Sequence, residues 1–185
     1  LYALGFDMRI IHTVGGRISV KVNKYEQTFG ESVNWLRVTM YAAISHFLNS
    51  QLGSSFCHGK SAVEIGGSEG TIASVLTSLG ANYLVAPPYP KVQVESLPYD
   101  DEAFDFVVLD QVLEHSRKPW LAAKEVSRVL KKSGICICTS VFVYPCHSDF
   151  AGQWKDHYRF SPDAWRSLFE GFDILIADGW GNADA

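Results

Sequence analysis

Residues 61 to 76, SAVEIGGSEGTIASVL, combine an acidic side chain with closely spaced glycines. An apolar run ends at Glu64, and Gly66, Gly67 and Gly70 follow before apolar residues recur at helical spacing. Glycines let the backbone turn sharply and approach a ligand closely at the start of a helix. The stretch therefore predicts a ligand-binding turn between a strand and a helix.

A dinucleotide site is one alternative for this turn. It requires the spacing Gly-x-Gly-x-x-Gly and an acidic residue about 20 positions further on for the ribose. The glycine spacing differs here, and the second predicted strand ends in Val85-Ala86-Pro87-Pro88 without an acid. We therefore do not predict an NAD site.

Histidines follow two later predicted strands, His115 after "FDFVVLD" and His147 after "GICICTSVFV". An imidazole titrates near neutral pH, so either ring is a candidate general base. Tyr158 lies in a polar cluster with Asp156, His157 and Arg159 and is a third candidate. The alternatives are that His115 hydrogen-bonds the backbone of its turn and that Tyr158 and Arg159 anchor the helix that follows.

Two of the four cysteines stand in Cys-His pairs, Cys57-His58 and Cys146-His147, which suggest zinc ligands. The first pair precedes a predicted strand and the second follows one, so we expect them at opposite ends of the sheet. We therefore predict no metal site. Cys136 and Cys138 alternate with isoleucines and are expected to be small buried hydrophobic residues.

Strands and helices alternate along the chain from residue 61. Before them, residues 9–22 predict a β-hairpin around Gly15-Gly16, and apolar residues at helical spacing predict a long helix over 31–52. The predicted strands are 62–65, 83–86, 91–94, 104–110, 134–143 and 172–177, and the predicted helices are 70–79, 119–131 and 162–169. Continuously apolar strands are typical of a sheet that helices cover on both faces. The pattern indicates an α/β fold with a doubly wound, mostly parallel sheet, in which ligands bind beyond the carboxyl ends of the strands.

The glycine-rich turn resembles motif I of the class I S-adenosylmethionine-dependent methyltransferases, with Ser68 at the place of the middle glycine. "LPYDDEAFDFVVLDQVLEH" is similar to the approach to the fourth strand in this family, which ends in Leu-Glu-His. "PWLAAKEVSRVLKKSGICICTS" is similar to the next helix and strand. "HYRFSPDAWRSLFEGFDI" resembles the Tyr-x-Arg-Phe-x-Pro helix of one large subgroup of small-molecule enzymes. Together these motifs cover about residues 60–177.

The resemblance implies a Rossmann-like methyltransferase core and S-adenosylmethionine as the cofactor. It implies that Glu64 and the backbone of the turn face the methionine end of the cofactor, with Asp110 and Gln111 lining the same cleft. Leu97 would pack near the adenine, and Glu95 could replace the acid that usually holds the adenine amino group. Capping of the following turn is the alternative for Asp110, and core packing is the alternative for Leu97. The implied cofactor-binding residues are Glu64, Gly66, Gly67, Ser68, Gly70, Glu95, Leu97, Asp110 and Gln111.

The sequence also departs from the family pattern. Ala86-Pro87-Pro88 stands where an acidic residue normally binds both ribose hydroxyls, and no helix is predicted between the second and third strands. No seventh strand follows residue 177, which indicates a core truncated at its C-terminus. We divide the chain into residues 1–55, the hairpin and amphipathic helix, and residues 56–185, the core. The hairpin, a missing segment or a partner chain is expected to cover the open edge of the sheet.

Composition limits the function further. The 185 residues carry 16 basic and 20 acidic side chains and a net charge of -4, so nucleic-acid binding is not predicted. No apolar stretch is long enough to span a membrane and no signal peptide is visible, so a cytoplasmic protein is predicted. We expect methyl transfer from S-adenosylmethionine to a small molecule such as a sugar or lipid intermediate. The alternative is a degenerate, non-catalytic methyltransferase-like domain that acts as a scaffold or regulatory module in a larger protein.

Overall fold

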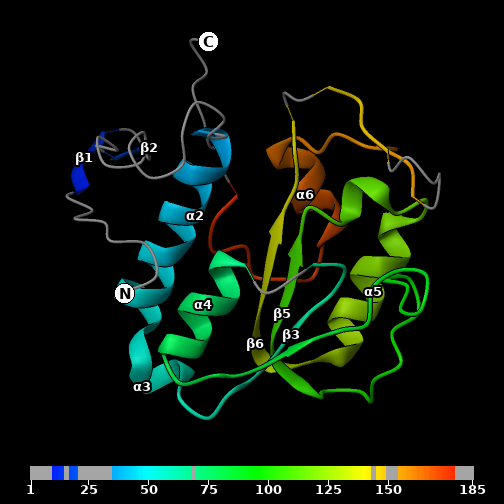
Figure 1. Ribbon diagram of the computed structural model, residues 1–185, viewed down its shortest axis with the longest axis horizontal. Helices are drawn as coiled ribbons and strands as arrows, with labels where there is room; N and C mark the ends of the chain where they lie inside the picture. The colour runs from blue at the N-terminus through cyan, green and yellow to red at the C-terminus, as the bar shows by residue number, and fades with distance from the viewer. Residues whose placement is uncertain are drawn as a thin grey trace.

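The computed structural model describes residues 10–14, 17–20, 35–67, 70–142, 145–148 and 154–177 (Figure 1). The Gly15-Gly16 turn, residues 31–34 of the predicted long helix and Ser68 lie outside the described residues. Strands β1 (Ile10–Val14) and β2 (Arg17–Val20) pair antiparallel, which confirms the strands of the predicted hairpin.

A long helical segment precedes the sheet. Helix α2 (Trp35–Phe47) continues through one π-helical turn, η2 (Leu48–Leu52), into the short helix α3 (Gly53–Cys57). The predicted helix is confirmed where it is described. Helix α3 continues the helical path beyond the predicted end at residue 52, after a change of direction at Gly53, whose φ is +67°.

The sheet has four described strands, all parallel, in the order β4-β3-β5-β6. They are β3 (Ser61–Glu64), β4 (Asn82–Val85), β5 (Phe104–Asp110) and β6 (Leu130–Thr139). Helix α4 (Thr71–Ser78) connects β3 to β4. The short helix η3 (Leu113–His115) and helix α5 (Pro119–Val129) connect β5 to β6, and α6 (Pro162–Leu168) follows.

Helices cover both faces of this sheet (Figure 1). On one face, Phe106 and Val108 of β5 pack in a core cluster with Leu48 of η2 and with Ile72 and Leu76 of α4. On the other face, Val107 and Leu109 of β5 pack with residues of α5, among them Ala122, Val126 and Val129. Successive residues of a strand point to opposite faces, so the continuously apolar sequence of β5 fits burial on both sides. The predicted doubly wound α/β fold is confirmed.

Three predicted strand assignments are wrong. Residues 91–94 form turns with a single bridge between Gln93 and Ser96, although Val92 and Val94 are buried. Residues 172–177 form no strand, and their Ile174, Leu175 and Ile176 are exposed. Strand β6 runs over 130–139 instead of 134–143, because Leu130 already pairs with Phe104 and a register shift joins the two parts. Among the described residues, no further strand pairs with β4 or β6. The covering of a sheet edge by the hairpin or by a partner chain stays a prediction.

Candidate functional site

The order of the strands creates a switch point between β3 and β5. The chain leaves β3 toward β4 and returns to β5 on the opposite side of β3. Ligands of open α/β sheets bind beyond the carboxyl ends of the strands at such a point. The turns after Glu64 and after Asp110 both begin there, so the residues predicted for the cofactor from these two turns share one end of the sheet.

The turn after β3 depends on two glycines. Gly66 has a φ of +75°, and a Cβ at this position would lie 3.0 Å from Cγ2 of Val112, which follows β5. A Cβ at Gly67 would lie 1.8 Å from Oε1 of Glu64. The glycines therefore bring the turn against the segment after β5 and make room for the Glu64 carboxylate.

Glu64 is 3% exposed, and its Oε2 accepts a hydrogen bond of 2.9 Å from the Tyr83 hydroxyl on β4. Burial raises the pKa of the Tyr83 hydroxyl, and the adjacent Glu64 carboxylate raises it further. Tyr83 therefore remains a hydrogen-bond donor and orients Glu64 beneath the glycine turn.

The end of β5 carries a hydrogen-bonded network. Asp110 accepts hydrogen bonds from the hydroxyls of Tyr41 on α2 and Thr139 on β6. Gln111 has a φ of 59°, and its side-chain amide donates to Thr139 at 3.0 Å. The Gln111 Oε1 atom is buried and has no hydrogen-bond donor among the described residues. Asp110 thus connects β5 to α2 and β6. Gln111 Oε1 can accept a hydrogen bond from a bound ligand.

These residues fit the methionine end of S-adenosylmethionine. Gly66, Gly67 and Gly70 border the turn, Gly70 directly precedes α4, and Gln111 Oε1 could accept a hydrogen bond from an ammonium group. The ribose end of the cofactor would find fewer hydrogen-bond partners, because the residues after β4 are Ala86, Pro87 and Pro88. None of these three side chains can accept a hydrogen bond.

Leu97 and Glu95 already have protein contacts. Leu97 is 5% exposed and belongs to the core cluster against α5, while its backbone N–H donates to Glu125 at 2.7 Å. Glu95 accepts a hydrogen bond of 2.6 Å from the Ser116 hydroxyl. Their predicted contacts with the adenine stay predictions.

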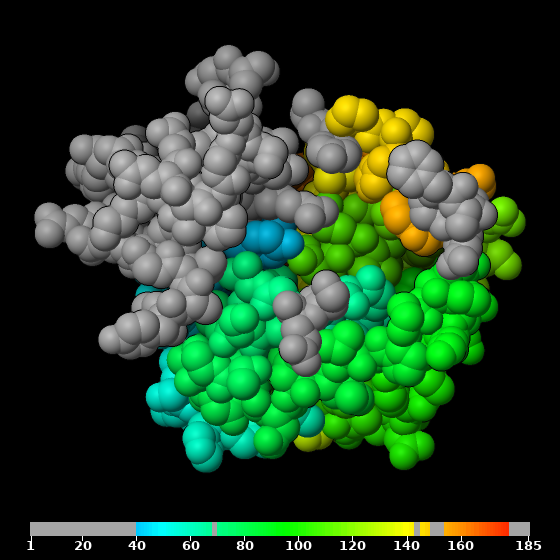
Figure 2. Space-filling model, viewed as in Figure 1, coloured from blue at the N-terminus to red at the C-terminus, as the bar shows by residue number. Residues whose placement is uncertain are grey.

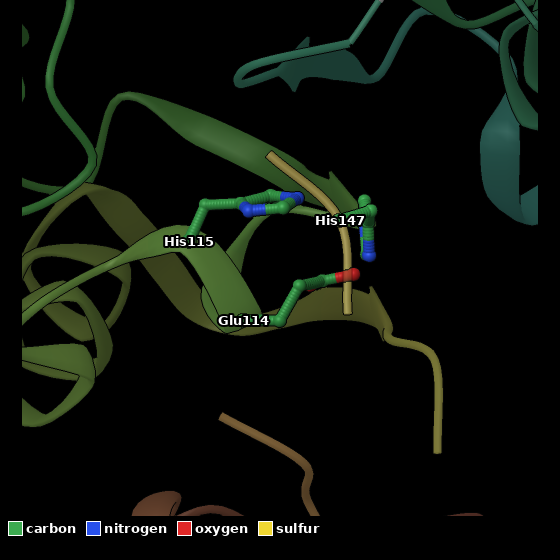
Figure 3. Close-up of side chains that lie close together, drawn as sticks. All are labelled: Glu114, His115 and His147. Atoms are coloured by element: carbon green, nitrogen blue, oxygen red, sulfur yellow. The ribbon is translucent and has the colours of Figure 1, made fainter. Parts of the chain in front are cut away.

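A second group of polar side chains lies after β5 and β6. One ligand atom from each of Glu114, His115 and His147 lies within 4.8 Å of the others. Figure 3 shows the carboxylate and the two rings close together. The ring centroids of His115 and His147 are 4.9 Å apart, and Trp154 lies 4.3 Å from the His115 ring. In Figure 2, the yellow and orange atoms of the segment after β6 lie beside green atoms from the middle of the chain.

Glu114 is fully buried, with 0% exposure. Burial raises the pKa of its carboxyl group, and the nearby backbone, the His115 charge and the Ser140 hydroxyl oppose this only in part. Neither carboxylate oxygen has a donor in hydrogen-bonding geometry within the part of the chain that the structure describes. The buried carboxylate therefore lacks a well-formed hydrogen bond from the described residues.

His147 is positioned by a pair of charged residues. Its backbone N–H donates to Asp156 at 2.8 Å, and its Nδ1 lies 3.1 Å from the same carboxylate. Arg159 binds both oxygens of Asp156, with a distance of 2.7 Å between Nη2 and Oδ2. Hydrogen bonds from Arg159 hold the pKa of Asp156 well below its usual range against the opposing effect of burial. An ionised Asp156 thus fixes the loop that carries His147.

Of the three predicted catalytic residues, the structure brings His115 and His147 together but not Tyr158. The Tyr158 hydroxyl donates to the backbone carbonyl of Arg117 at 3.3 Å, and its ring stacks on Phe160. The sequence prediction did not include Glu114 as a site residue. Its position directly before His115 in the sequence was the only signal that could have indicated it.

The two Cys-His pairs lie at opposite ends of the sheet, as predicted. Cys57 is buried before the amino end of β3, whereas Cys146 is exposed after the carboxyl end of β6. Cys136 and Cys138 lie on β6 and pack against the core cluster on the α5 face. Their Sγ atoms are 3.2 Å apart, and both thiols are free.

Comparisons with known proteins point to one class. Residues 58–138 match the sequence model of the family described as "Methyltransferase domain". An "Uncharacterized methyltransferase" of Mycolicibacterium vanbaalenii is 26% identical over 97 residues, which are 43% of this chain and 38% of the relative. A relative of Mycobacterium marinum with the same description is 24% identical over 97 residues. The chain therefore spans well under half the length of the curated relatives it matches.

A solved structure from Galdieria sulphuraria, described as a candidate sarcosine dimethylglycine methyltransferase, has the same fold. It superposes with a TM-score of 0.52 at 17% identity and covers 70% of this chain and 60% of that one. The chain therefore has a Rossmann-like α/β fold. The sequence matches support a methyltransferase domain over residues 58–138. Among the described residues, no helix has the length and apolar character needed to cross a membrane.

Proposed function

We propose that this protein binds S-adenosylmethionine and transfers its methyl group to a small-molecule acceptor. The observation that carries the proposal is the glycine turn over the buried Glu64 carboxylate at the switch point of the sheet, where Gln111 Oε1 is buried without a donor among the described residues. The match of residues 58–138 to a methyltransferase domain supports the same chemistry.

The residues proposed to hold the methionine end are Glu64, Gly66, Gly67, Ser68, Gly70, Asp110 and Gln111. When bound, S-adenosylmethionine supplies an electrophilic methyl group. The protein's own contribution is to orient the two reactants and exclude water, because an in-line displacement depends mainly on positioning. Tyr41, through its hydrogen bond to Asp110, joins α2 to this end of the sheet.

The acceptor side is proposed to lie near His115 and His147. An acceptor that must lose a proton requires a base within hydrogen-bonding reach. The two imidazoles suit this role better than Tyr158, whose hydroxyl is directed to a backbone carbonyl. A small molecule is the proposed acceptor because the chain has a net charge of -4 and no basic run. A sugar or lipid intermediate and a cytoplasmic location stay predictions from the sequence.

Calorimetric titration with S-adenosylmethionine, and separately with S-adenosylhomocysteine, tests the proposal. We expect micromolar binding that Gly66→Arg abolishes, because the side chain would enter the turn beside Val112. Gly59→Arg is the matched control: Gly59 has a similar φ of +73° with nothing within 4 Å of an added Cβ. Absence of binding up to millimolar concentration, or equal loss in both variants, would contradict the proposal.

A second function is favoured by one observation. The segment after β4, Ala86-Pro87-Pro88, offers no side-chain acceptor for the ribose hydroxyls, and a lost hydrogen bond costs about 0.5–1.5 kcal/mol. A non-catalytic domain that serves as a scaffold in a larger protein would have this feature. The same titration separates the two functions, because only the enzyme must bind the cofactor.

A further inference from the structure

Glu114, His115 and His147 form a set of nitrogen and oxygen ligands from two separate segments. Glu114 and His115 are consecutive in η3, and His147 comes from the loop after β6. Their ligand atoms lie within 4.8 Å of one another (Figure 3). Two imidazoles and one carboxylate form a donor set that binds zinc and other divalent transition metals, with at least one coordination position left open.

We propose that Glu114, His115 and His147 bind one divalent transition-metal ion, for which Zn²⁺ is the best match. The inference does not depend on the proposed methyl transfer, since the ligand set is complete without the cofactor turn. It replaces the sequence-based prediction that the chain has no metal site. A ring nitrogen that binds the ion cannot also accept a proton, so the base proposed above would act in the metal-free chain.

The burial of Glu114 is the strongest support. Its side chain is fully buried, and neither carboxylate oxygen has a donor in hydrogen-bonding geometry among the described residues, although the Ser140 hydroxyl and the Val141 backbone lie near it. A buried carboxylate without well-formed hydrogen bonds is unfavourable, whereas a coordinated one is compensated by the charge of the ion. A pair of histidines that only transfers protons would leave this carboxylate unexplained.

The histidines are held as metal ligands usually are. His115 Nδ1 lies 2.8 Å from the backbone carbonyl of Lys155, which can only accept, so Nδ1 carries the proton. The Nε2 atom is then free of a proton and can bind a metal. His147 Nδ1 lies 3.1 Å from the carboxylate of Asp156, which Arg159 in turn fixes. A carbonyl or carboxylate behind each imidazole is the usual second layer of a metal site.

The site requires only a small adjustment. Ligand atoms around a tetrahedral zinc ion with bonds of about 2.0–2.1 Å lie roughly 3.4 Å apart. Atoms separated by up to 4.8 Å must therefore close by no more than about 1.4 Å, which side-chain rotation can supply. The open coordination position would take water or an oxygen atom of a ligand such as a hydroxyl or carboxylate group.

Metal binding to the full chain tests the proposal. The chelator-treated protein is titrated with Zn²⁺ by calorimetry and with Co²⁺ by visible absorption. We expect one ion per chain, and we expect Glu114→Gln and His147→Gln each to weaken binding at least about 10-fold. His157→Gln is the matched control, since His157 is exposed and outside the set, and its affinity should not change.

Cys146→Ser separates this site from a thiolate site, because Cys146 is exposed and adjacent to His147. We expect unchanged affinity in this variant. Thermal unfolding provides an independent measurement: Zn²⁺ should raise the midpoint of the wild type but not of Glu114→Gln or His147→Gln. The proposal is overturned if Zn²⁺ does not bind stoichiometrically, if Glu114→Gln and His147→Gln bind as tightly as the wild type, or if Cys146→Ser abolishes binding. A failed S-adenosylmethionine titration would leave this result unaffected.

Discussion

The Asp105 carboxylate joins three strands at the amino end of the sheet. It accepts hydrogen bonds from the backbone N–H and hydroxyl of Ser61 at 3.0 and 2.9 Å, from Lys60 at 3.1 Å and from Lys131 at 2.8 Å. Burial opposes ionisation of this group, but the hydrogen bonds from Lys131, Ser61 and Lys60 outweigh it. They hold the pKa of Asp105 well below its usual range.

We expect Asp105→Asn to lower the free energy of unfolding at pH 7 by about 1–2 kcal/mol, since hydrogen bonds to a charged group are lost and the partly exposed lysines contribute little. Because the folded pKa is lowered, the stabilisation is fully present above the unfolded value of about 3.9 and is lost as the pH falls below it. Urea denaturation between pH 7 and pH 3 should therefore show a weaker acid destabilisation in the variant. Asp163→Asn, at an exposed surface pair, should leave the pH dependence unchanged.

Among single elements, the loop with His147 depends most clearly on one ion pair. Arg159 binds Asp156 through two nitrogens, and Asp156 accepts the His147 backbone N–H. Lysine keeps the charge but cannot form the paired contacts of a guanidinium group. We expect Arg159→Lys to increase hydrogen exchange at the His147 amide at least about 10-fold, because local opening becomes easier.

The control for this prediction is Arg166→Lys. Arg166 also pairs with an aspartate three residues away, but the pair is exposed on α6. Exchange at His147 should match the wild type in this variant. Equal exchange in Arg159→Lys would mean that the loop does not depend on the ion pair.

The elements also show what the sequence could predict. The boundaries of α4, α5 and α6 and of the strands around Glu64 and Asp110 were predicted to within about two residues, because caps, glycines and apolar runs are local signals. Residues 91–94 were predicted as a strand because alternating valines indicate burial. Val92 and Val94 are buried by packing on the core cluster and not by strand pairing.

The site was predictable in part, because the strands that precede its two histidines are local signals. His115 and His147 each follow a strand, so their shared edge follows from parallel topology. Their contact with a fully buried Glu114 was not predictable, because it depends on residues 154–160 folding back over η3. The backbone N–H groups of His157 and Tyr158 both donate to the Glu114 carbonyl. Such contacts between distant segments leave no periodic pattern in the sequence.

At the scale of the whole molecule, the question is whether the N-terminal helix and the core unfold together. Leu48 of η2 is fully buried against Phe106 and Val108 of the central strand β5. The opposite face of β5 packs on α5. A substitution that destabilises the packing of Leu48 should therefore also destabilise α5, because both pack on β5.

We expect Leu48→Ala to lower the free energy of unfolding by about 2–4 kcal/mol through loss of buried apolar surface and formation of a cavity. Urea denaturation followed by circular dichroism should show one transition with an unchanged slope. The slowest amides of α5 should lose the same free energy in hydrogen exchange. Leu84→Ala is the control, because Leu84 is 46% exposed on β4 and its truncation should cost little. Wild-type protection of α5 alongside lost protection of α2 would contradict cooperative unfolding. That result would instead support the predicted division of the chain into residues 1–55 and 56–185.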